Sequence, residues 1–347
     1  MKVCHFGIFN PHYPRNAIIK KGLELQGVEV LEYTDRGKGL SKYARLWNRH
    51  RKLRDSYDVM LIGFPGQAAA PIARIFVRRP VVLDAFLSLY DTNVLDRKRA
   101  REGSLGAWYW KALDTIAARS ARTVLVDTNA HGDYLHQLTG ISRDRFKRIF
   151  AGCDDEEVYP LDDVQPQEFT VHFHGYLVPF HGIETILAAA RELKSDPIKF
   201  RIVTRLNGAG RKVQAHALDL PHVIWHDEVP RAELNRMLGT SSVVLGVFGN
   251  TPKLQHVIPN KIFEGLAAKR PVITAESAAV RELLTNGENC MLVPAGNPQA
   301  LTRAIRKLFQ DSAFAQTIGQ NGYNVYKQNA TPFVIGNQVK SLIESLL

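Results

Sequence analysis

The chain carries twelve short runs of apolar and β-branched residues, separated by stretches with the apolar spacing of helices. Strands covered by helices on both faces consist of nearly continuous apolar residues, and alternation with helices is typical of parallel sheets with crossover connections. The pattern therefore predicts an α/β fold. We expect strands within residues 2–9, 28–33, 58–64, 80–86, 123–128, 147–152, 170–176, 199–205, 222–227, 242–248, 270–276 and 289–295.

The expected strands form two sets of six, on either side of an acidic, proline-bearing segment at residues 152–169. A chain of 347 residues exceeds the usual size of one hydrophobic core, so two domains are expected. We predict Rossmann-like domains over residues 1–160 and 161–330 and a last helix over 331–347. Two doubly wound domains facing a central cleft would place their ligand sites just after the strands.

Charge is distributed unevenly between the two halves of the chain. Residues 1–150 contain 26 Lys and Arg against 14 Asp and Glu, a balance of +12, whereas the remainder has a balance of −1. The basic half is therefore expected to meet an anionic partner, such as phospholipid, a phosphorylated substrate or nucleic acid.

Cysteine usage and the N-terminus indicate the compartment. Cys4, Cys153 and Cys290 lie far apart without metal-ligand spacing, which favours a reducing compartment and argues against a disulfide framework or a zinc site. The N-terminus is too interrupted for a signal peptide, and no apolar run approaches the roughly 20 residues of a membrane span. We expect a cytoplasmic protein, either free or attached peripherally to the inner face of the cell membrane.

A lysine and a glutamate open one predicted helix. Lys261 and Glu264 stand three residues apart in "IPNKIFEGLAAK", after a loop and a proline. Free N–H groups at a helix start, with Lys261 beside them, can hold a phosphate, and Glu264 can accept hydrogen bonds from a diol. The alternative is an ordinary ion pair on a capped surface helix, which would contribute about 0.3 kcal/mol.

Residues 258–305, which begin with this motif, resemble the nucleotide-sugar-binding half of the retaining glycosyltransferases of family 4, which have the two-domain GT-B fold. The resemblance extends over most of residues 170–325, whereas over residues 1–150 it rests on organisation and a few dipeptides. It implies that Glu264 holds the donor ribose and that Asn260 and Lys261 approach the donor phosphates or the sugar. It also implies that the last helix returns toward the first domain.

Two departures from the family pattern affect the expected donor site. The family often has a glutamate at the position of His256, which here is either a replacement or an ordinary loop histidine. It also often has Arg after Gly175 and Lys six positions after that glycine, where this chain has Tyr176 and His181. The resemblance still implies that the turn at Gly175 faces the donor phosphates.

Other cations are then needed to stabilise charge on a departing diphosphate. The candidates are Lys253, Arg205, Lys261 and a protonated His181, whose charge would depend on pH. Arg205 and Lys253 could equally be solvated surface cations. No metal or cofactor is expected, because the resemblance implies no obligatory metal.

The first half offers acceptor-side candidates. The turn Gly7–Asn16 resembles the family's N-terminal loop, which suggests roles for Tyr13, Arg15 and Asn16, although a plain strand-to-helix connection is the alternative. Asp84 follows a buried strand where the family often has a histidine; it could orient the acceptor, with assistance from Asp91, or it could cap the next helix. The glycine-rich dinucleotide fingerprint is absent, which argues against a dehydrogenase.

Two basic stretches, residues 42–54 and 96–113, contain Trp47, Trp108, Tyr109 and Trp110. Cations together with tryptophan are typical of helices that lie on anionic membrane surfaces, but basic helices with Trp turned into the core are common. No zinc spacing, helix-turn-helix pattern or RNP-type run supports nucleic-acid binding.

These observations predict a glycosyltransferase that moves a hexose-type sugar from a nucleotide sugar to an acceptor hydroxyl, with retention of configuration implied by the resemblance. A lipid-linked or glycan acceptor, in polysaccharide or glycolipid assembly at the membrane surface, fits the basic first half. The alternatives are a GT-B nucleotide-sugar epimerase or phosphorylase, and a non-catalytic anion-binding protein.

Overall fold

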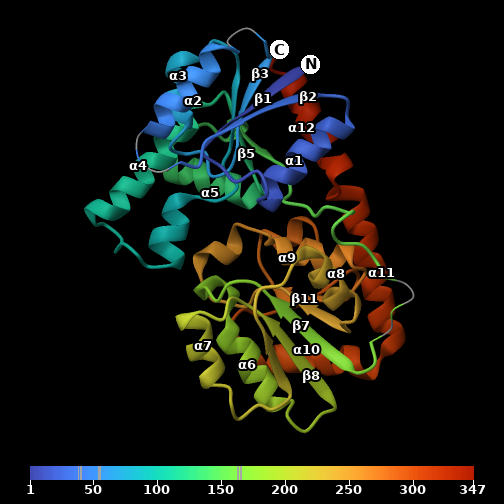
Figure 1. Cartoon of the computed structure of the whole chain (residues 1–347). Helices are drawn as coiled ribbons and strands as arrows, with labels where there is room; N and C mark the ends of the chain where they lie inside the picture. Colours follow the sequence, from blue (N-terminus) through green and yellow to red (C-terminus); the bar gives the residue numbers. More distant parts are fainter. Residues whose placement is uncertain (38, 40, 54–55, 162–163, 165) are drawn as a thin grey trace. The chain divides into compact units, whose positions relative to one another are not determined.

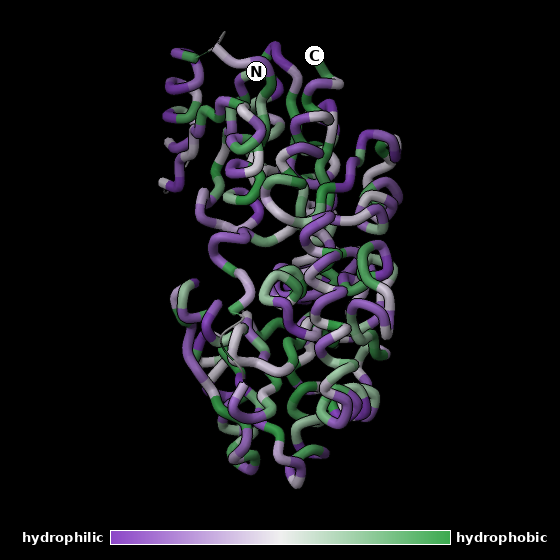
Figure 2. Tube along the Cα trace, turned by 90° about the vertical axis from the view of Figure 1, so that its right-hand side faces the viewer, coloured by the Kyte–Doolittle hydropathy of each residue, from purple (hydrophilic) through white to green (hydrophobic). Residues whose placement is uncertain are grey.

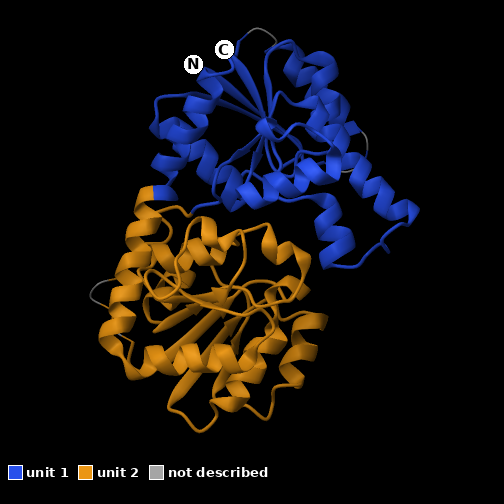
Figure 3. Cartoon of the chain, turned by 180° about the vertical axis from the view of Figure 1, so that it is seen from behind, with its two compact units in different colours: residues 1–152, 329–347 blue, residues 153–328 orange. Residues whose placement is uncertain are grey.

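The computed structural model describes all residues except 38, 40, 54, 55, 162, 163 and 165, so parts of the predicted connector 152–169 and of the basic stretch 42–54 lie outside the described residues. The chain divides into two compact units (Figure 3). Unit 1 comprises residues 1–152 and 329–347, and unit 2 comprises residues 153–328. The boundaries expected from the sequence were 160/161 and 330/331.

Unit 1 is a parallel six-stranded sheet with helices on both faces (Figure 1). The strand order is β2-β1-β3-β4-β5-β6. The strands are β1 (Lys2–Gly7), β2 (Glu29–Thr34), β3 (Val59–Ile62), β4 (Val81–Asp84), β5 (Thr123–Val126) and β6 (Phe146–Arg148). The α-helices are α1 (Pro14–Leu25), α2 (Ser41–Arg51), α3 (Ala70–Phe76), α4 (Leu105–Ser120), α5 (Asn129–Thr139) and α12 (Pro332–Glu344), with a π-helix η1 (Asp91–Asp96) and a 3-10 turn η2 (Arg143–Arg145).

Unit 2 repeats this architecture with the strand order β12-β11-β10-β7-β8-β9. Its strands are β7 (Phe169–His174), β8 (Ile198–Val203), β9 (Val223–His226), β10 (Val243–Leu245), β11 (Val272–Ala275) and β12 (Met291–Val293). Its α-helices are α6 (Ile183–Glu192), α7 (Gly208–Ala215), α8 (Arg231–Gly239), α9 (Asn260–Ala267), α10 (Pro298–Gln310) and α11 (Ser312–Asn329), with 3-10 turns η3 (Pro179–His181), η4 (Pro252–Gln255) and η5 (Val280–Glu282). All twelve predicted strands are present, and the predicted α/β class is confirmed.

The cores follow from the alternation of side chains along each strand. In β3, Val59 and Leu61 belong to one buried cluster and Met60 and Ile62 to another, so the sheet of unit 1 has an apolar layer on each face. Apolar and polar stretches alternate along the chain in both units (Figure 2). Because both faces are covered, the chemistry of each unit is left to the loops at the strand ends.

Helix α12 packs on α1 at close range. An added Cβ at Gly22 would lie 2.3 Å from the Pro332 carbonyl oxygen, and one at Gly336 would lie 2.0 Å from the Gly22 carbonyl oxygen. The two glycines therefore let the helix backbones touch. Ile335 and Val339 extend the buried layer that covers this face of the sheet. The C-terminal segment thus completes the core of unit 1.

Each strand order reverses at one place. In unit 1 the chain moves outward in opposite directions from β1 and β3, and in unit 2 it does so from β7 and β10. Loops after strands on either side of such a point diverge, which leaves room for a ligand beside the strand ends. The loops after β7 and β10 are therefore the first place to look for a site in unit 2.

Candidate functional site

The turn after β7 brings a glycine, a lysine and a histidine together. Gly175 has φ of +127°, a conformation that favours glycine. A Cβ there would lie 3.1 Å from the Lys261 amine nitrogen and 3.4 Å from Cε1 of His181. Glycine therefore allows both side chains to approach the backbone of the turn. Three of the predicted donor-site residues meet here, although they are up to 86 positions apart in the chain.

Lys261 lies in the first turn of α9 and is buried. Among the residues that the structure describes, its amine has no hydrogen-bond or salt-bridge partner, and it lies 4.0 Å from the centroid of the Phe173 ring. Burial lowers the pKa of Lys261 well below its ordinary value, and Glu264 opposes this shift only partly. The surface Lys–Glu ion pair considered as the sequence alternative is therefore wrong.

The rest of the α9 start also suits an anion. The N-cap residue is Pro259, which has no side-chain acceptor for the first N–H groups of the helix. Asn260 follows, and its buried Oδ1 has no hydrogen-bond partner among the described residues. Helix N–H groups and a buried amine together form an environment in which a negatively charged ligand would be stabilised.

Glu264 is buried within unit 2 and lies between two side chains that sequence reasoning missed. Its Oε2 lies 2.6 Å from Nε2 of His174, and its Oε1 accepts a hydrogen bond of 2.6 Å from Arg231. Burial alone would raise the pKa of Glu264, but His174 and Arg231 together hold it below its ordinary value. The carboxylate is therefore ionised and its orientation is fixed.

This geometry changes what Glu264 can do. The sequence suggested an open carboxylate, whereas each oxygen already accepts one hydrogen bond. A carboxylate oxygen has two acceptor positions, so one hydroxyl could still be accepted at each oxygen. Arg231 is itself held by Glu157, with an Nε to Oε2 distance of 2.9 Å. A hydrogen-bonded support of this kind positions a binding carboxylate before the ligand arrives.

A histidine pair continues from Glu264 into the sheet. Because the ionised Glu264 can only accept, Nε2 of His174 donates to it. Nε2 of His172 lies 3.2 Å from Nδ1 of His174, so the two rings are linked side by side. Burial, followed by the nearby His174, lowers the pKa of His172 well below its ordinary value, so His172 is neutral. The histidine pair thus extends the hydrogen-bonded support of Glu264 into the sheet.

His181 is neutral too, which corrects the sequence-based expectation of a protonated side chain. Burial and then Lys261 lower its pKa well below the ordinary value. Its Nδ1 faces the Tyr176 carbonyl, so this nitrogen donates and Nε2 is left as an acceptor. His181 therefore does not supply a fixed positive charge at this turn at neutral pH.

The remaining donor-site candidates lie around the same loops. Lys253 is buried in η4, 5.9 Å from the Phe180 ring. Arg205 is exposed, pairs with Glu228 at 2.7 Å and lies over the exposed Tyr176 ring at 5.3 Å. The pairing of Arg205 fits the surface-cation alternative. His256 follows η4, and its N–H donates to the Lys253 carbonyl as in an ordinary turn.

In unit 1, Arg15 and Asp84 form a buried ion pair. Nε and one terminal nitrogen of Arg15 lie 3.0–3.2 Å from the Asp84 oxygens, and the other terminal nitrogen donates to the carbonyls of Ile149 and Phe150. Asp84 does not cap a helix, because residues 85–88 are not helical and the helical turn begins only at Leu89. Its burial also conflicts with direct contact to an acceptor, and the pair instead ties α1 to the ends of β4 and β6.

The predicted acceptor-side loop is shorter than expected. Helix α1 begins at Pro14, so Arg15 and Asn16 are helical and buried, and only Tyr13 stays in the loop as the N-cap residue. The Asn16 side chain makes two hydrogen bonds with the backbone of Phe64. Its Nδ2 donates to the Phe64 carbonyl at 2.6 Å, and its Oδ1 accepts from the Phe64 N–H at 2.9 Å. Arg15 and Asn16 therefore stabilise the strand ends rather than reach into solvent.

A second acidic residue, Asp114, supports the loop after β4 and was not predicted. It accepts hydrogen bonds from Ser88 Oγ at 2.7 Å and from the N–H groups of Leu89 and Tyr90. Burial raises the pKa of Asp114 to about 6. Asp91 lies beside it and donates from its N–H to Ser88 Oγ. An aspartate among the small residues of one helix face was the signal that could have identified Asp114.

The tryptophans of the basic stretches differ in their environments. Trp47 is half-buried and packs against the partly exposed Phe76 with ring centroids 3.8 Å apart. Trp108 is exposed on α4, and the alternative of a Trp turned into the core is wrong for it. Within the described ranges no helix is long and apolar enough to cross a bilayer. The same ranges hold no group of three or more His, Cys, Asp or Glu side chains placed to bind a metal ion.

Comparisons with known proteins are consistent with this arrangement. Residues 168–311 match the family model described as glycosyl transferases group 1. HepE of Anabaena, solved with UDP and glucose, superposes with a TM-score of 0.75 at 17% identity, over 99% of this chain and 100% of that one. Sucrose-phosphate synthase of Thermosynechococcus elongatus superposes with a TM-score of 0.79 at 15% identity, over 100% and 99% of the two chains. These similarities confirm the predicted GT-B fold class.

Curated relatives match over shorter segments. CapM of Staphylococcus aureus, a capsular polysaccharide biosynthesis glycosyltransferase, is 28% identical over 88 residues, which cover 25% of this chain and 23% of CapM. EpsD of Bacillus subtilis, a glycosyltransferase by name, is 33% identical over 61 residues, which cover 18% of this chain and 16% of EpsD. The chain thus matches less than a quarter of the length of these relatives.

Proposed function

We propose that this protein is a glycosyltransferase that moves a hexose-type sugar from a nucleotide sugar to an acceptor hydroxyl, with unit 2 binding the donor. The observation that carries the proposal is the buried amine of Lys261, without a counter-ion among the described residues, beside Gly175 and the start of α9. Burial disfavours the charged form of this amine, and a bound diphosphate would favour it. The nearby carboxylate of Glu264, held by His174 and Arg231, suits a ribose diol.

The finer parts of the proposal rest on similarity. Retention of configuration follows from the resemblance of residues 170–325 to family 4. The match to group 1 glycosyl transferases and the UDP complex of HepE support a nucleotide-sugar donor. The name of CapM supports polysaccharide assembly, with a glycan or lipid-linked acceptor at the cytoplasmic face of the membrane. The proposal assigns charge stabilisation to Lys261 and Lys253 and requires no metal.

A ligand screen tests the donor assignment. Nucleoside diphosphates bind only the folded state, so UDP, GDP or ADP at about 100 times its Kd should stabilise the protein by about 2.7 kcal/mol and raise its melting temperature. Incubation with the matching nucleotide sugar and a glycan acceptor should then give a glycosylated product with the anomeric configuration of the donor. A protein whose melting temperature responds to none of the nucleotides contradicts the proposal, and release of an epimer or a sugar phosphate would favour the alternative activities.

The role of Lys261 can be tested by measuring proton uptake on nucleotide binding. Burial lowers its pKa in the free protein, and a bound diphosphate favours the charged form, so binding should raise this pKa and take up a proton. In the pH interval between the two values, nucleotide affinity should rise as the pH falls. Titration calorimetry in buffers of different ionisation enthalpy measures the uptake, which should be absent in Lys261→Met. Lys194, which is exposed just after the end of α6, offers Lys194→Met as a control that should keep the proton uptake.

A further inference from the structure

Helix α4 turns an apolar stripe toward solvent. Leu105, Trp108, Tyr109 and Ile116 are 89%, 70%, 53% and 49% exposed. Their spacing of three, four and eleven positions places them on one face of the helix, within about 100° of arc. Exposed helix faces normally carry polar residues, so a stripe of this size on an outer face indicates an interaction surface.

The opposite face of α4 is already packed. Ala107, Asp114, Ala117 and Ala118 are buried, and they lie on the side of the helix away from the stripe. Asp114 fixes the rotation of the helix through its three hydrogen bonds to the loop after β4. The helix therefore cannot rotate the stripe inward without losing both the packing of the alanines and the bonds of Asp114.

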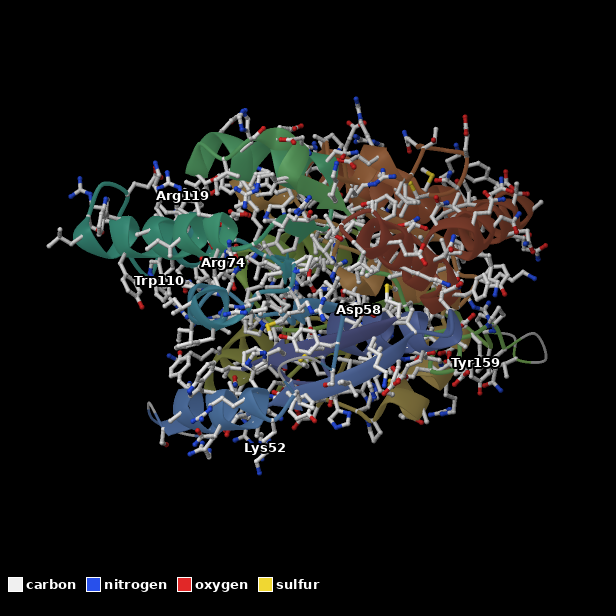
Figure 4. All side chains as sticks on the ribbon, turned by 90° about the horizontal axis from the view of Figure 1, so that it is seen from above. Lys52, Asp58, Arg74, Trp110, Arg119 and Tyr159 are labelled. Carbon is white, nitrogen blue, oxygen red and sulfur yellow. The ribbon has the colours of Figure 1, made fainter. Side chains whose placement is uncertain are left out.

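The surroundings of the stripe are strongly cationic. Between residues 74 and 122 the exposed cations are Arg74, Arg78, Arg79, Arg97, Lys98, Arg99, Arg101, Lys111, Arg119 and Arg122. Over the same range Glu102 is the one exposed acidic residue, because Asp84, Asp91, Asp96 and Asp114 are buried. Arg74 on α3 and Arg119 on α4 belong to helices that pack together, and both are labelled with Trp110 in Figure 4. Positive charge thus flanks the apolar stripe.

We propose that this face, formed by α4 and the flanking cations, docks on an anionic phospholipid bilayer. Tryptophan and tyrosine suit the headgroup level, and leucine and isoleucine suit the acyl boundary beneath it. The arginines and lysines would meet the lipid phosphates, each near cation strengthening binding about fivefold at low salt. The inference deepens the proposed function, on which it rests for the location of the acceptor.

Two other occupants fit the observations less well. Nucleic acid would satisfy the cations, but it offers no apolar surface to Leu105 or Ile116. A second copy of the chain in a symmetric dimer would place this cationic face against itself, and like charges across an interface repel. An anionic membrane surface, by contrast, can bind both the apolar stripe and the flanking cations.

Vesicle sedimentation of the full chain tests the proposal. The protein should bind vesicles made of equal parts phosphatidylglycerol and phosphatidylcholine, bind pure phosphatidylcholine at least about tenfold more weakly, and lose affinity as salt rises. The double variant Leu105→Ser/Trp108→Ser should reduce binding to the anionic vesicles at least tenfold, because two large apolar side chains no longer enter the bilayer. Leu218→Ser, at an 80% exposed leucine in unit 2, is the matched control and should bind as the parent does.

The outcomes separate this surface from the donor site. Melting temperature and nucleotide affinity, measured without vesicles, should be the same in the double variant and in the parent protein. If the parent protein binds vesicles but no nucleotide, the result contradicts the proposed function and leaves the docking surface standing. Full vesicle binding by the double variant would overturn the docking surface. So would binding to duplex DNA without binding to vesicles, or a dimer in sedimentation velocity that the double variant abolishes.

Discussion

Replacing Asp84 with alanine should lower the free energy of unfolding of unit 1 by about 3–5 kcal/mol, the usual cost of leaving one member of a buried ion pair unpaired. The Arg15 guanidinium would stay enclosed, with its bonds to the carbonyls of Ile149 and Phe150 but no counter-charge. Chemical denaturation monitored by circular dichroism measures the loss. Asp84→Asn, which keeps the shape and one acceptor, should lose less.

A control uses a pair of the same type with an exposed carboxylate. Arg143 and Asp133 form an ion pair on the surface of unit 1, where the Asp133 side chain is 60% exposed, and Asp133→Ala should cost at most about 1 kcal/mol. If Asp84→Ala is as stable as Asp133→Ala, yet transfers sugar slowly with normal nucleotide affinity, the structural role is wrong and Asp84 acts on the acceptor.

Replacing Glu264 with glutamine should weaken binding of a nucleoside diphosphate by about 1.5–3 kcal/mol, roughly 10- to 150-fold. Glutamine has nearly the same shape, but it carries no charge and one of its two polar ends donates, so the bonds from both Arg231 and His174 cannot persist. The ribose diol of the ligand would then face an amide whose orientation is no longer fixed by these two bonds. Isothermal titration of the folded variant gives the change in Kd.

The comparison with a 2′-deoxynucleotide identifies the diol as the group that is lost. In the parent protein the deoxynucleotide should bind more weakly than the ribonucleotide, and in Glu264→Gln the two should bind almost equally. Glu233→Gln, at a surface carboxylate of unit 2 paired with Arg236, should leave both affinities unchanged. A Glu264→Gln protein that still prefers the ribonucleotide by the parental ratio shows that Glu264 does not contact the ribose.

Local pattern was sufficient to locate the elements. The apolar runs gave all twelve strands, because a strand buried on both faces needs consecutive apolar residues whatever its neighbours are. Pro259 and the residues after it predicted a helix start, and α9 begins at Asn260. The placement of Lys261 and Glu264 in one short helix also followed, since three positions are less than one turn. The exposed tryptophan on α4 was among the options left open.

The tertiary structure decided the partners. Glu264 meets His174 and Arg231 across 90 and 33 positions, and Arg15 meets Asp84 across 69. These contacts depend on which strands are neighbours, and the strand order β12-β11-β10-β7-β8-β9 is absent from the periodicity of any one segment. The sequence by itself therefore determined the elements and the residue types at their ends. Burial, which depends on packing of distant segments, decided that Lys261 lacks a counter-ion, that His181 is neutral and that Asp84 is enclosed.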